Sequence, residues 1–296
     1  MPSLRPFIDS QAPARLQYVR VKPVPAYRWA SRAGRRTAGR GELAGQGPRG
    51  IALSGRIACL ASAPLFKGVP AAALDELASN ARESRLSAKH SLFREGEPAR
   101  EASLLVAGRM KVTQVTSSGD VVIQRLVGPG EIVGDPIPGA GSLHSATPVA
   151  LEPCDVLAWD ARAFERLSER FPLLQRNALR IVAERVRDLE QRYCELATEK
   201  VASRLARTLL RLLGQLGRTR GGVVVIELSR EELGQMIGAT LFSVSRLLSQ
   251  WEGQGVVSSA RESIVVRDPA ELVRLAEAAG DDGSPQGLSS PLTARR

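Results

Sequence analysis

Hydrophobic residues follow three different periods along this chain, and each period predicts a different kind of structure. Between residues 91 and 137 apolar and polar positions alternate in short runs broken by glycines, which is typical of an antiparallel barrel or jelly roll. From Phe171 to about Lys200 apolar residues recur at helical spacing and predict one long helix. From Leu228 to Val257 two shorter helical stripes flank a glycine. We therefore expect an α+β fold, with a jelly-roll-like β-roll first and helical elements after it.

The long helix carries its apolar residues as a single stripe. The spacing of these residues is 3, 4, 3, 4, 3, which is the a/d seam that a two-stranded coiled coil requires. We expect this seam to pair with a second copy of the chain; the alternative is that it packs against its own β-roll. The seam residues are Leu179, Val182, Val186, Leu189, Tyr193 and Leu196.

The stretch from Leu228 to Val257 predicts two short helices around a tight turn. Ser229 and Glu232 have the spacing of a capping box, which satisfies backbone N–H groups at a helix start. Gly238 stands where the first helix must end and the chain must turn. Two helices joined in this way form a helix-turn-helix, whose second helix lies in the DNA major groove.

The second helix has an apolar face and a polar face. Thr240 can cap its start, and its outward Arg246 can bond both O6 and N7 of a guanine. Phe242 is expected to be exposed, where it can meet a thymine methyl group. The predicted DNA-binding residues are Arg246, Ser243, Ser245, Phe242, Thr240, Ser229, Arg230 and Arg261.

A small hairpin follows the second helix. Its β-branched segments, Val256 to Val257 and Ile264 to Val266, flank a polar turn from Ser259 to Ser263. This hairpin would make a winged helix-turn-helix, with Arg261 at the tip near a DNA phosphate. The alternative is a helical hairpin that is packed for structural reasons only.

Charge is distributed unevenly within the formal net charge of +10. Residues 1–50 hold ten basic against two acidic side chains, and residues 51–199 hold eighteen against nineteen. Residues 200–267 hold ten against five, and residues 268–296 hold three against five. A nearly neutral middle joined to a basic module is what a sensor joined to a DNA-binding domain would show.

The remaining composition excludes several classes of protein. No apolar run approaches the roughly 18 residues of a membrane helix, and no secretory signal precedes the first helix, so a cytoplasmic protein is expected. Three widely separated cysteines do not form a disulfide framework or a zinc site, and two histidines supply neither a cupin-like metal site nor a Ser-His-Asp triad. An enzyme is therefore not expected.

The C-terminal stretch resembles the DNA-binding domain of the Crp/Fnr family of bacterial transcription regulators. The resemblance rests on the triplet Val244-Ser245-Arg246, the pair Leu247-Leu248 and the glycine-bounded wing. It implies that Arg246 contacts a guanine of the operator. The family's base-contacting glutamate matches Phe242 here, so the rest of the half-site is not implied.

The middle of the chain resembles the cyclic-nucleotide-binding β-roll of the same family. The matching elements are the strand end from Leu104 to Arg109 and the loop from Gly130 to Asp135. Where cyclic-AMP-binding members hold the phosphate with an arginine, this chain has His144, a weaker substitute, so cyclic AMP is not the expected effector. The expected effector-pocket residues are Gly134, Asp135, His144 and Ser145.

Other cofactors of the family can also be tested against the sequence. Its oxygen-sensing iron–sulfur cluster needs four cysteines, three of them near the N-terminus, and only Cys59 lies there. Haem stays open, because His90 or His144 could be an axial ligand. The effector is therefore unknown at this stage.

Two functions of different classes remain. The first is a homodimeric, effector-controlled regulator that binds palindromic double-stranded DNA and works with RNA polymerase. The second is a small-molecule-binding regulatory module that acts on a partner protein. The expected domains are 1–50, a disordered basic extension; 51–165, the β-roll sensor; 166–200, the dimerisation helix; 201–275, the winged helix-turn-helix; and 276–296, a disordered tail.

Overall fold

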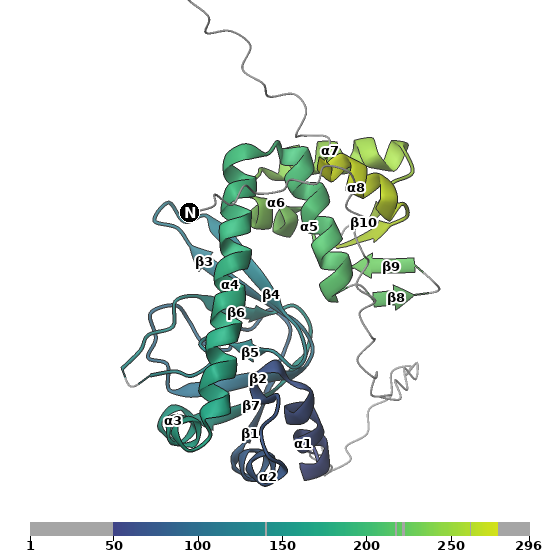
Figure 1. Cartoon of the computed structure of the whole chain (residues 1–296). Coiled ribbons are helices and arrows are strands. Elements are labelled where there is room, and N and C mark those ends of the chain that lie inside the picture. Colours follow the sequence, from purple (N-terminus) through teal and green to yellow (C-terminus); the bar gives the residue numbers. More distant parts are fainter. Residues whose placement is uncertain (1–49, 140, 217, 221–222, 261, 278–296) are drawn as a thin grey trace, which may run out of the picture. The chain divides into compact units, whose positions relative to one another are not determined.

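The β-roll and the helical elements follow the predicted order along the chain (Figure 1). The computed structural model describes residues 50–139, 141–216, 218–220, 223–260 and 262–277. The predicted basic extension and C-terminal tail therefore lie almost entirely outside the described residues. The helices are α1 (Leu53–Ser62), the 3-10 helix η1 (Pro64–Phe66), α2 (Ala71–Asn80), α3 (Ala161–Arg170), α4 (Pro172–Thr198), α5 (Val201–Leu216), α6 (Arg230–Ile237), α7 (Leu241–Gly253) and α8 (Pro269–Glu277).

The β-roll consists of two antiparallel sheets. One sheet has the strand order β1-β7-β2-β5 and the other has the order β4-β3-β6. Residues from both sheets, including Leu105, Met110, Val127 and Val156, form one buried cluster between them. The predicted antiparallel roll is thus confirmed. Its strands are β1 (Arg82–Leu86), β2 (Glu101–Ala107), β3 (Met110–Val115), β4 (Val121–Val127), β5 (Ile132–Val133), β6 (Thr147–Ala150) and β7 (Cys154–Asp160).

The turn between β2 and β3 depends on a glycine. Gly108 has φ +88, and a Cβ built on it would lie 2.6 Å from both the carbonyl oxygen of Pro153 and the Sγ of Cys154. We expect Gly108→Ala to lower the free energy of unfolding by more than the roughly 1–3 kcal/mol of a left-handed non-glycine residue, because the clash adds to the backbone strain. Gly119, with φ +89 and open space around it, is the matched control. Equal losses for both alanine variants in urea unfolding would contradict this expectation.

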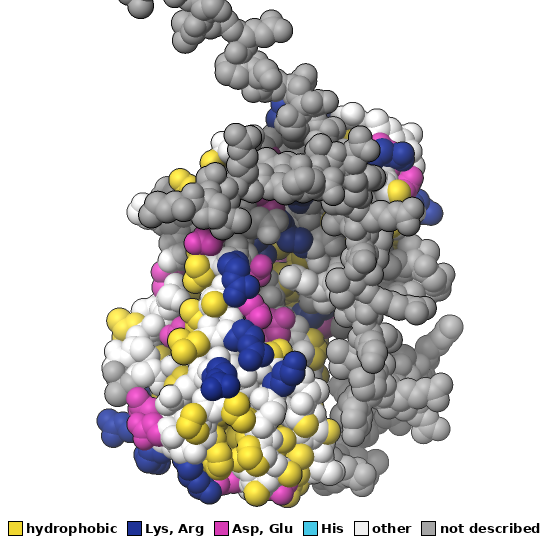
Figure 2. Space-filling view, viewed as in Figure 1, with side chains coloured by type: hydrophobic (Ala, Val, Ile, Leu, Met, Phe, Trp, Pro, Cys, Tyr) yellow, Lys and Arg dark blue, Asp and Glu magenta, His cyan; other side chains and the backbone are white. Residues whose placement is uncertain are grey.

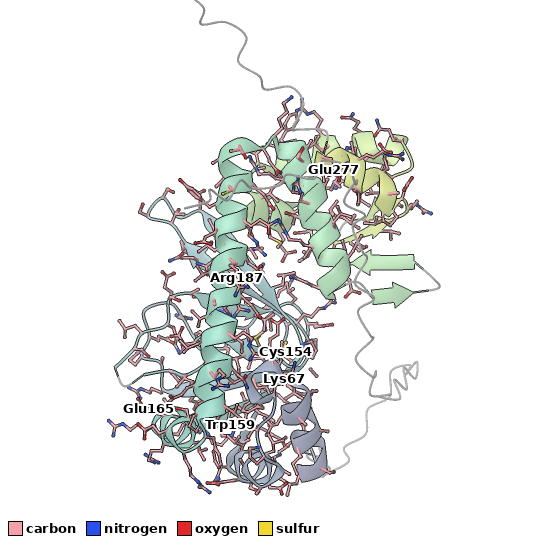
Figure 3. All side chains as sticks on the ribbon, viewed as in Figure 1. Lys67, Cys154, Trp159, Glu165, Arg187 and Glu277 are labelled. Carbon is pink, nitrogen blue, oxygen red and sulfur yellow. The ribbon has the colours of Figure 1, made fainter. Side chains whose placement is uncertain are left out.

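A second cluster fills the space between the first sheet and the helices beside it. Trp159 of β7 is labelled in Figure 3. It belongs to the same buried cluster as Leu60, Phe66, Leu77 and Phe164, and its indole N–H donates to the carbonyl oxygen of Leu77 at 2.8 Å. This packing holds the helices before β1 and the helix α3 after β7 against the start of α4.

The long helix α4 begins with Pro172 at its first turn, as the sequence predicted. The residues of α4 that are buried lie elsewhere than the predicted seam: they are Leu174, Asn177, Ala178 and Glu195. All six seam residues are exposed, by 43% at Val182 up to 71% at Leu179 and Tyr193. The seam is therefore not buried against its own roll in the single chain, and its pairing with a second copy stays a prediction. Hydrophobic and basic side chains lie together on the face over α4 (Figure 2).

The C-terminal part of the chain contains a third antiparallel sheet, in the order β10-β11-β9-β8. The wing is longer than predicted: Ala260 pairs with Ser263, so its turn is narrower than the expected span from Ser259 to Ser263. Strand β8 was not predicted. The hydrophobic cluster of this part includes Leu209, Val244 and Trp251. The strands are β8 (Arg218–Arg220), β9 (Val223–Ile226), β10 (Val257–Ala260) and β11 (Ser263–Val266).

Candidate nucleic-acid interface and ligand pocket

The first helix of the helix-turn-helix, α6, starts with the predicted capping box. The Ser229 Oγ accepts from the backbone N–H of Glu232 at 3.1 Å, and the Glu232 Oε2 accepts from the backbone N–H of Ser229 at 2.9 Å. The helix ends at Gly238, which has φ 63 in the left-handed region. A Cβ on Gly234 would lie 2.6 Å from the carbonyl oxygen of Ala239, so a glycine is needed for the close turn. The local signals in the sequence thus set both ends of α6.

Glu232 also joins this domain to the β-roll. Its Oε1 accepts from the Nζ of Lys111 on β3 at 2.8 Å, and Ile123 and Leu126 of β4 belong to the same hydrophobic cluster as α6. Burial raises the pKa of Glu232, but the bonds from Lys111 and Ser229 outweigh it and hold the pKa below its ordinary value. The pair therefore stabilises the fold above the unfolded pKa of a glutamate, and this contribution is lost as the pH falls through the lowered value.

We expect Ser229→Ala to reduce the free energy of unfolding by about 0.5–2 kcal/mol, because it leaves the N–H of Glu232 without its cap. Ser249→Ala, at an exposed position of α7, is the control and should change it by less than about 0.5 kcal/mol. Urea unfolding measures both. A Ser229 variant no less stable than the Ser249 variant would show that the box does not hold the helix.

The second helix, α7, has the predicted cap and the predicted buried face. The Oγ1 of Thr240 accepts from the backbone N–H of Ser243 at 3.2 Å, and Val244, Leu248 and Trp251 are buried. Arg246 is exposed on the opposite side, and it makes no hydrogen bond or ion pair with any other described residue. No side chain of the described residues therefore occupies its guanidinium.

Two apolar side chains are also exposed at the start of α7. Phe242 is 76% exposed and Leu241 is 52% exposed. Exposed apolar side chains beside an exposed arginine are typical of a surface that contacts a partner. The sequence predicted that Phe242 is exposed, whereas the exposure of Leu241 was not predicted.

The other predicted DNA-binding residues are bonded within the protein, half-buried or outside the described residues. The hydroxyl of Ser229 is engaged in the capping box, and the guanidinium of Arg230 donates to the Oγ of Ser259 at 2.6 Å. Ser243 is half-buried, with its hydroxyl 3.0 Å from the Oγ1 of Thr240, and Ser245 is half-buried. Arg261 lies outside the described residues. The hydroxyl of Ser229 is thus engaged at the start of its own helix, whereas the bond to Ser259 uses only one of the five N–H donors of Arg230.

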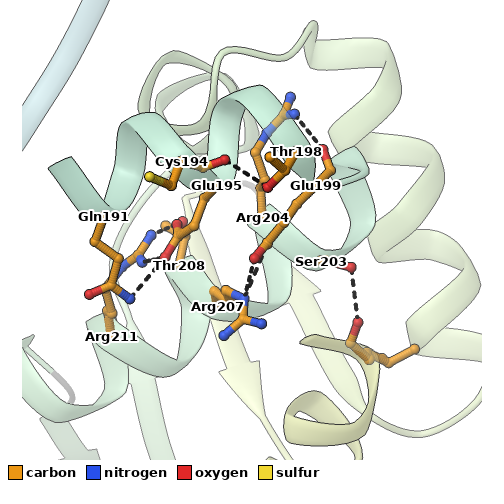
Figure 4. Close-up of polar contacts among 11 residues, drawn as sticks. Gln191, Cys194, Glu195, Thr198, Glu199, Ser203, Arg204, Arg207, Thr208 and Arg211 are labelled. Atoms are coloured by element: carbon orange, nitrogen blue, oxygen red, sulfur yellow. Dashed lines mark hydrogen bonds and ion pairs between the residues drawn. The ribbon is translucent and has the colours of Figure 1, made fainter. Parts of the chain in front are cut away.

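A polar network holds the junction between α4 and α5 (Figure 4). Glu195, which is buried, accepts from the Nη1 of Arg211 at 2.6 Å, and the Nε of Arg207 lies 2.9 Å from Glu199. Arg204 donates to the carbonyl oxygen of Glu199 at 2.8 Å and to that of Ile237, at the end of α6, at 3.2 Å. These bonds connect the long helix directly to the helix-turn-helix.

A cavity of about 300 Å³ lies between the β-roll and α4. All four predicted effector-pocket residues line it: Gly134, Asp135, His144 and Ser145. The wall formed by α4 includes Val182 and Leu189, which are also seam residues. The sequence therefore located the loop side of the pocket, whereas the side formed by α4 was not predicted.

The aromatic rings of His144 and Phe93 form a flat wall of this cavity. The two rings stack with centroids 3.5 Å apart and an interplanar angle of 7°. Burial lowers the pKa of His144, although Asp135 and Glu97 act in the opposite direction. The ring is therefore mostly neutral near pH 7 and does not supply a fixed positive charge for a phosphate.

The two histidines lie in different surroundings. His144 is buried against Phe93, while His90 is exposed, with its Nδ1 3.3 Å from the carbonyl oxygen of Ala88. Within the described part of the chain, no group of three His, Cys, Asp or Glu side chains could hold a metal ion. Nor is any described helix both long and apolar enough to cross a membrane.

Comparisons with known proteins agree with both halves of this architecture. Residues 83–171 match the family model of the cyclic nucleotide-binding domain, and residues 203–275 match that of the Crp-like helix-turn-helix domain. The CRP-like cAMP-activated global transcriptional regulator of Mycobacterium tuberculosis is 26% identical over 224 residues, which cover 73% of this chain and 98% of that protein.

Two further proteins are similar to this chain. The transcriptional activator protein anr of Pseudomonas aeruginosa is 28% identical over 207 residues, which cover 69% of this chain and 83% of that protein. The structure of FixK2 from Bradyrhizobium japonicum has the same fold, with a TM-score of 0.59 and 24% identity over 66% of this chain and 96% of that one. With its cyclic-nucleotide-binding-like roll and its Crp-like helix-turn-helix, the chain belongs to the Crp/Fnr family of transcription regulators.

Proposed function

We propose that this protein is a homodimeric transcription regulator that binds a palindromic DNA site under the control of a small effector. The observation that carries the proposal is Arg246, which is exposed on the capped helix α7 and engages no other described residue. A guanidinium presented in this way on the second helix of a helix-turn-helix can read a guanine with two bonds.

The exposed seam of α4 supports the dimer. A stripe of six exposed apolar residues at a/d spacing is costly to leave in water and is suited to pair with an identical stripe. A twofold axis along α4 would place two α7 helices on one duplex, with half-sites about one helical turn apart. We expect such a regulator to work in the cytoplasm and to contact RNA polymerase.

The cavity between the roll and α4 supports effector control. It is bounded on one side by the loop that holds Gly134 and His144, and on the other by the helix that carries the seam. A ligand that bound better in the DNA-binding arrangement than in the idle one would shift the population of the dimer towards DNA binding.

Native mass spectrometry of the protein purified from its own cytoplasm tests this function. We expect two chains in the free protein, and two chains per duplex after fragments of promoter DNA are added. A retained small molecule would appear as added mass in the same spectrum. Single chains that bind other proteins but no duplex would favour a regulatory module that acts on a partner protein.

A further inference from the structure

Two neighbouring apolar side chains are exposed at the start of α7, the second helix of the helix-turn-helix (Figure 1). Leu241 is 52% exposed and Phe242 is 76% exposed. Among the side chains described between residues 201 and 277, no other large hydrophobic one is exposed, and neither of these two belongs to the hydrophobic cluster of this part. Their hydrocarbon surface therefore contributes little to the stability of the single chain.

Phe242 lies on the same face of α7 as Arg246. The two residues are four positions apart in the helix, which corresponds to about 6 Å along its axis. Both are exposed, whereas Val244 and Leu248 on the opposite face are buried. The apolar pair and the arginine therefore belong to one surface at the N-terminal end of α7, the end that contacts base edges when such a helix lies in the major groove.

The first turn of α7 holds this pair in place. The Oγ1 of Thr240 accepts from the backbone N–H of Ser243 at 3.2 Å and lies 3.0 Å from the Oγ of Ser243. The two hydroxyls that flank the apolar pair are thus engaged within the helix. A contact residue on a capped helix is positioned more precisely than one on a loop.

The chemistry of the pair restricts what it can recognise. Leu241 and Phe242 have no side-chain donor or acceptor, so they cannot read the hydrogen-bonding pattern of a base pair. They also cannot bond a phosphate, which is contacted by donors and positive charges. In the major groove only thymine presents a methyl group, at C5. A thymine methyl is therefore the group of a DNA duplex that suits this surface.

We propose that Leu241 and Phe242 together read the C5 methyl group of a thymine in each half-site, close to the guanine read by Arg246. This inference rests on the proposed DNA binding and names the base group that its apolar part recognises. Base pairs are stacked about 3.4 Å apart, so Phe242 reaches within about two base pairs of that guanine. The sequence predicted a thymine contact for Phe242 alone, and the structure adds Leu241.

Deoxyuridine tests the proposal, because it pairs like thymidine and lacks only the methyl group. The full chain first selects duplexes from a random pool, and each thymine of the selected site is then replaced in both half-sites. Fluorescence anisotropy measures the affinities. At one or two positions near the guanine we expect binding to weaken by about fourfold per half-site, or about 16-fold for two, the effect of burying one such group. Thymines elsewhere should tolerate the replacement.

Variants assign the methyl contact to the apolar pair. In Phe242→Ala the ratio of the thymine affinity to the deoxyuridine affinity should fall to about one, and Leu241→Ala should lower it part of the way. Leu143→Ala, at a leucine of the β-roll that is 58% exposed, is the control and should keep the full ratio. Because Phe242 is mostly exposed, the Tm of Phe242→Ala should equal that of the unchanged chain, which separates lost recognition from lost folding.

Cytosine bases separate the methyl group from the rest of the base pair. Cytosine in place of the sensitive thymine changes the hydrogen-bonding pattern and removes the methyl group, and 5-methylcytosine restores only the methyl group. We expect 5-methylcytosine to bind more tightly than cytosine by about the factor that separates thymine from deoxyuridine. Phe242→Glu should instead prefer cytosine with or without the methyl group, because a carboxylate accepts from its N4 amino group.

Three results would overturn the proposal: no thymine whose replacement weakens binding, the same thymine-to-deoxyuridine ratio in Phe242→Ala as in the unchanged chain, or 5-methylcytosine that binds no better than cytosine. A chain that selects a duplex but gives any of these results rejects methyl recognition, leaves the proposed regulator intact and assigns the apolar pair to contact with a protein. A chain that selects no duplex rejects the regulator itself.

Discussion

A glutamate at Val186 is expected to leave the chain monomeric and to weaken its binding to palindromic DNA by about 10²- to 10⁴-fold, the size of a lost second binding event. Val186 is 47% exposed, lies in the middle of the apolar seam and does not line the cavity. In a symmetric seam each glutamate would face apolar groups and the other copy's glutamate, and burying such charges without a partner is costly.

Sedimentation velocity measures this outcome as a change from twice the 31.8 kDa chain mass to that mass itself. Arg187→Glu is the control, because it introduces the same side chain at the next position of α4, outside the stripe. It should remain dimeric. A Val186→Glu protein that still sedimented as a dimer would show that the chain associates through another surface.

Removal of the Arg246 guanidinium is expected to weaken specific DNA binding by about 1–3 kcal/mol for each half-site, and thus by roughly 30-fold or more for two half-sites. Nonspecific binding should change little, because it depends on many phosphate contacts rather than on one base contact. Arg246→Lys should restore the positive charge but not the sequence specificity, because an ammonium group does not make the two parallel bonds of a guanidinium.

Fluorescence anisotropy on a selected site and on a scrambled duplex separates these effects. Arg267→Ala is the matched control, since Arg267 is an exposed arginine of the same domain outside α7. It loses the same charge and should lower both affinities to a similar, small extent. Equal losses on the two duplexes for Arg246→Ala would mean that this side chain does not read sequence.

The parts of the fold that could be predicted from sequence are those set by neighbouring residues. Ser229, Glu232 and Gly238 determine where α6 begins and ends through bonds within the helix itself, so their pattern was sufficient. The exposure of Arg246 followed from the apolar stripe on the other face of α7. The exposed seam of α4 followed from periodicity in the same way.

The parts that could not be predicted depend on contacts between distant residues. Arg125 is 60 residues from Arg185 in the chain, and nothing local indicates that they share a cavity with Phe93. Strand β8 was missed because it exists only through pairing with β9. The bond between Lys111 and Glu232 joins a β-roll strand to the helix-turn-helix across 121 residues, so neither residue could be assigned this partner from sequence.

The most direct test of a dimer that reads DNA sequence is selection of binding sites from random double-stranded oligonucleotides, followed by sequencing. We predict that the full chain enriches an inverted repeat, with a guanine in each half-site and half-site centres about 10–10.5 base pairs apart. Arg246→Ala should lose preference at that guanine while the repeat persists. Enrichment of no sequence, or of a single site without twofold symmetry, would contradict the proposal that two copies of α7 read the DNA together.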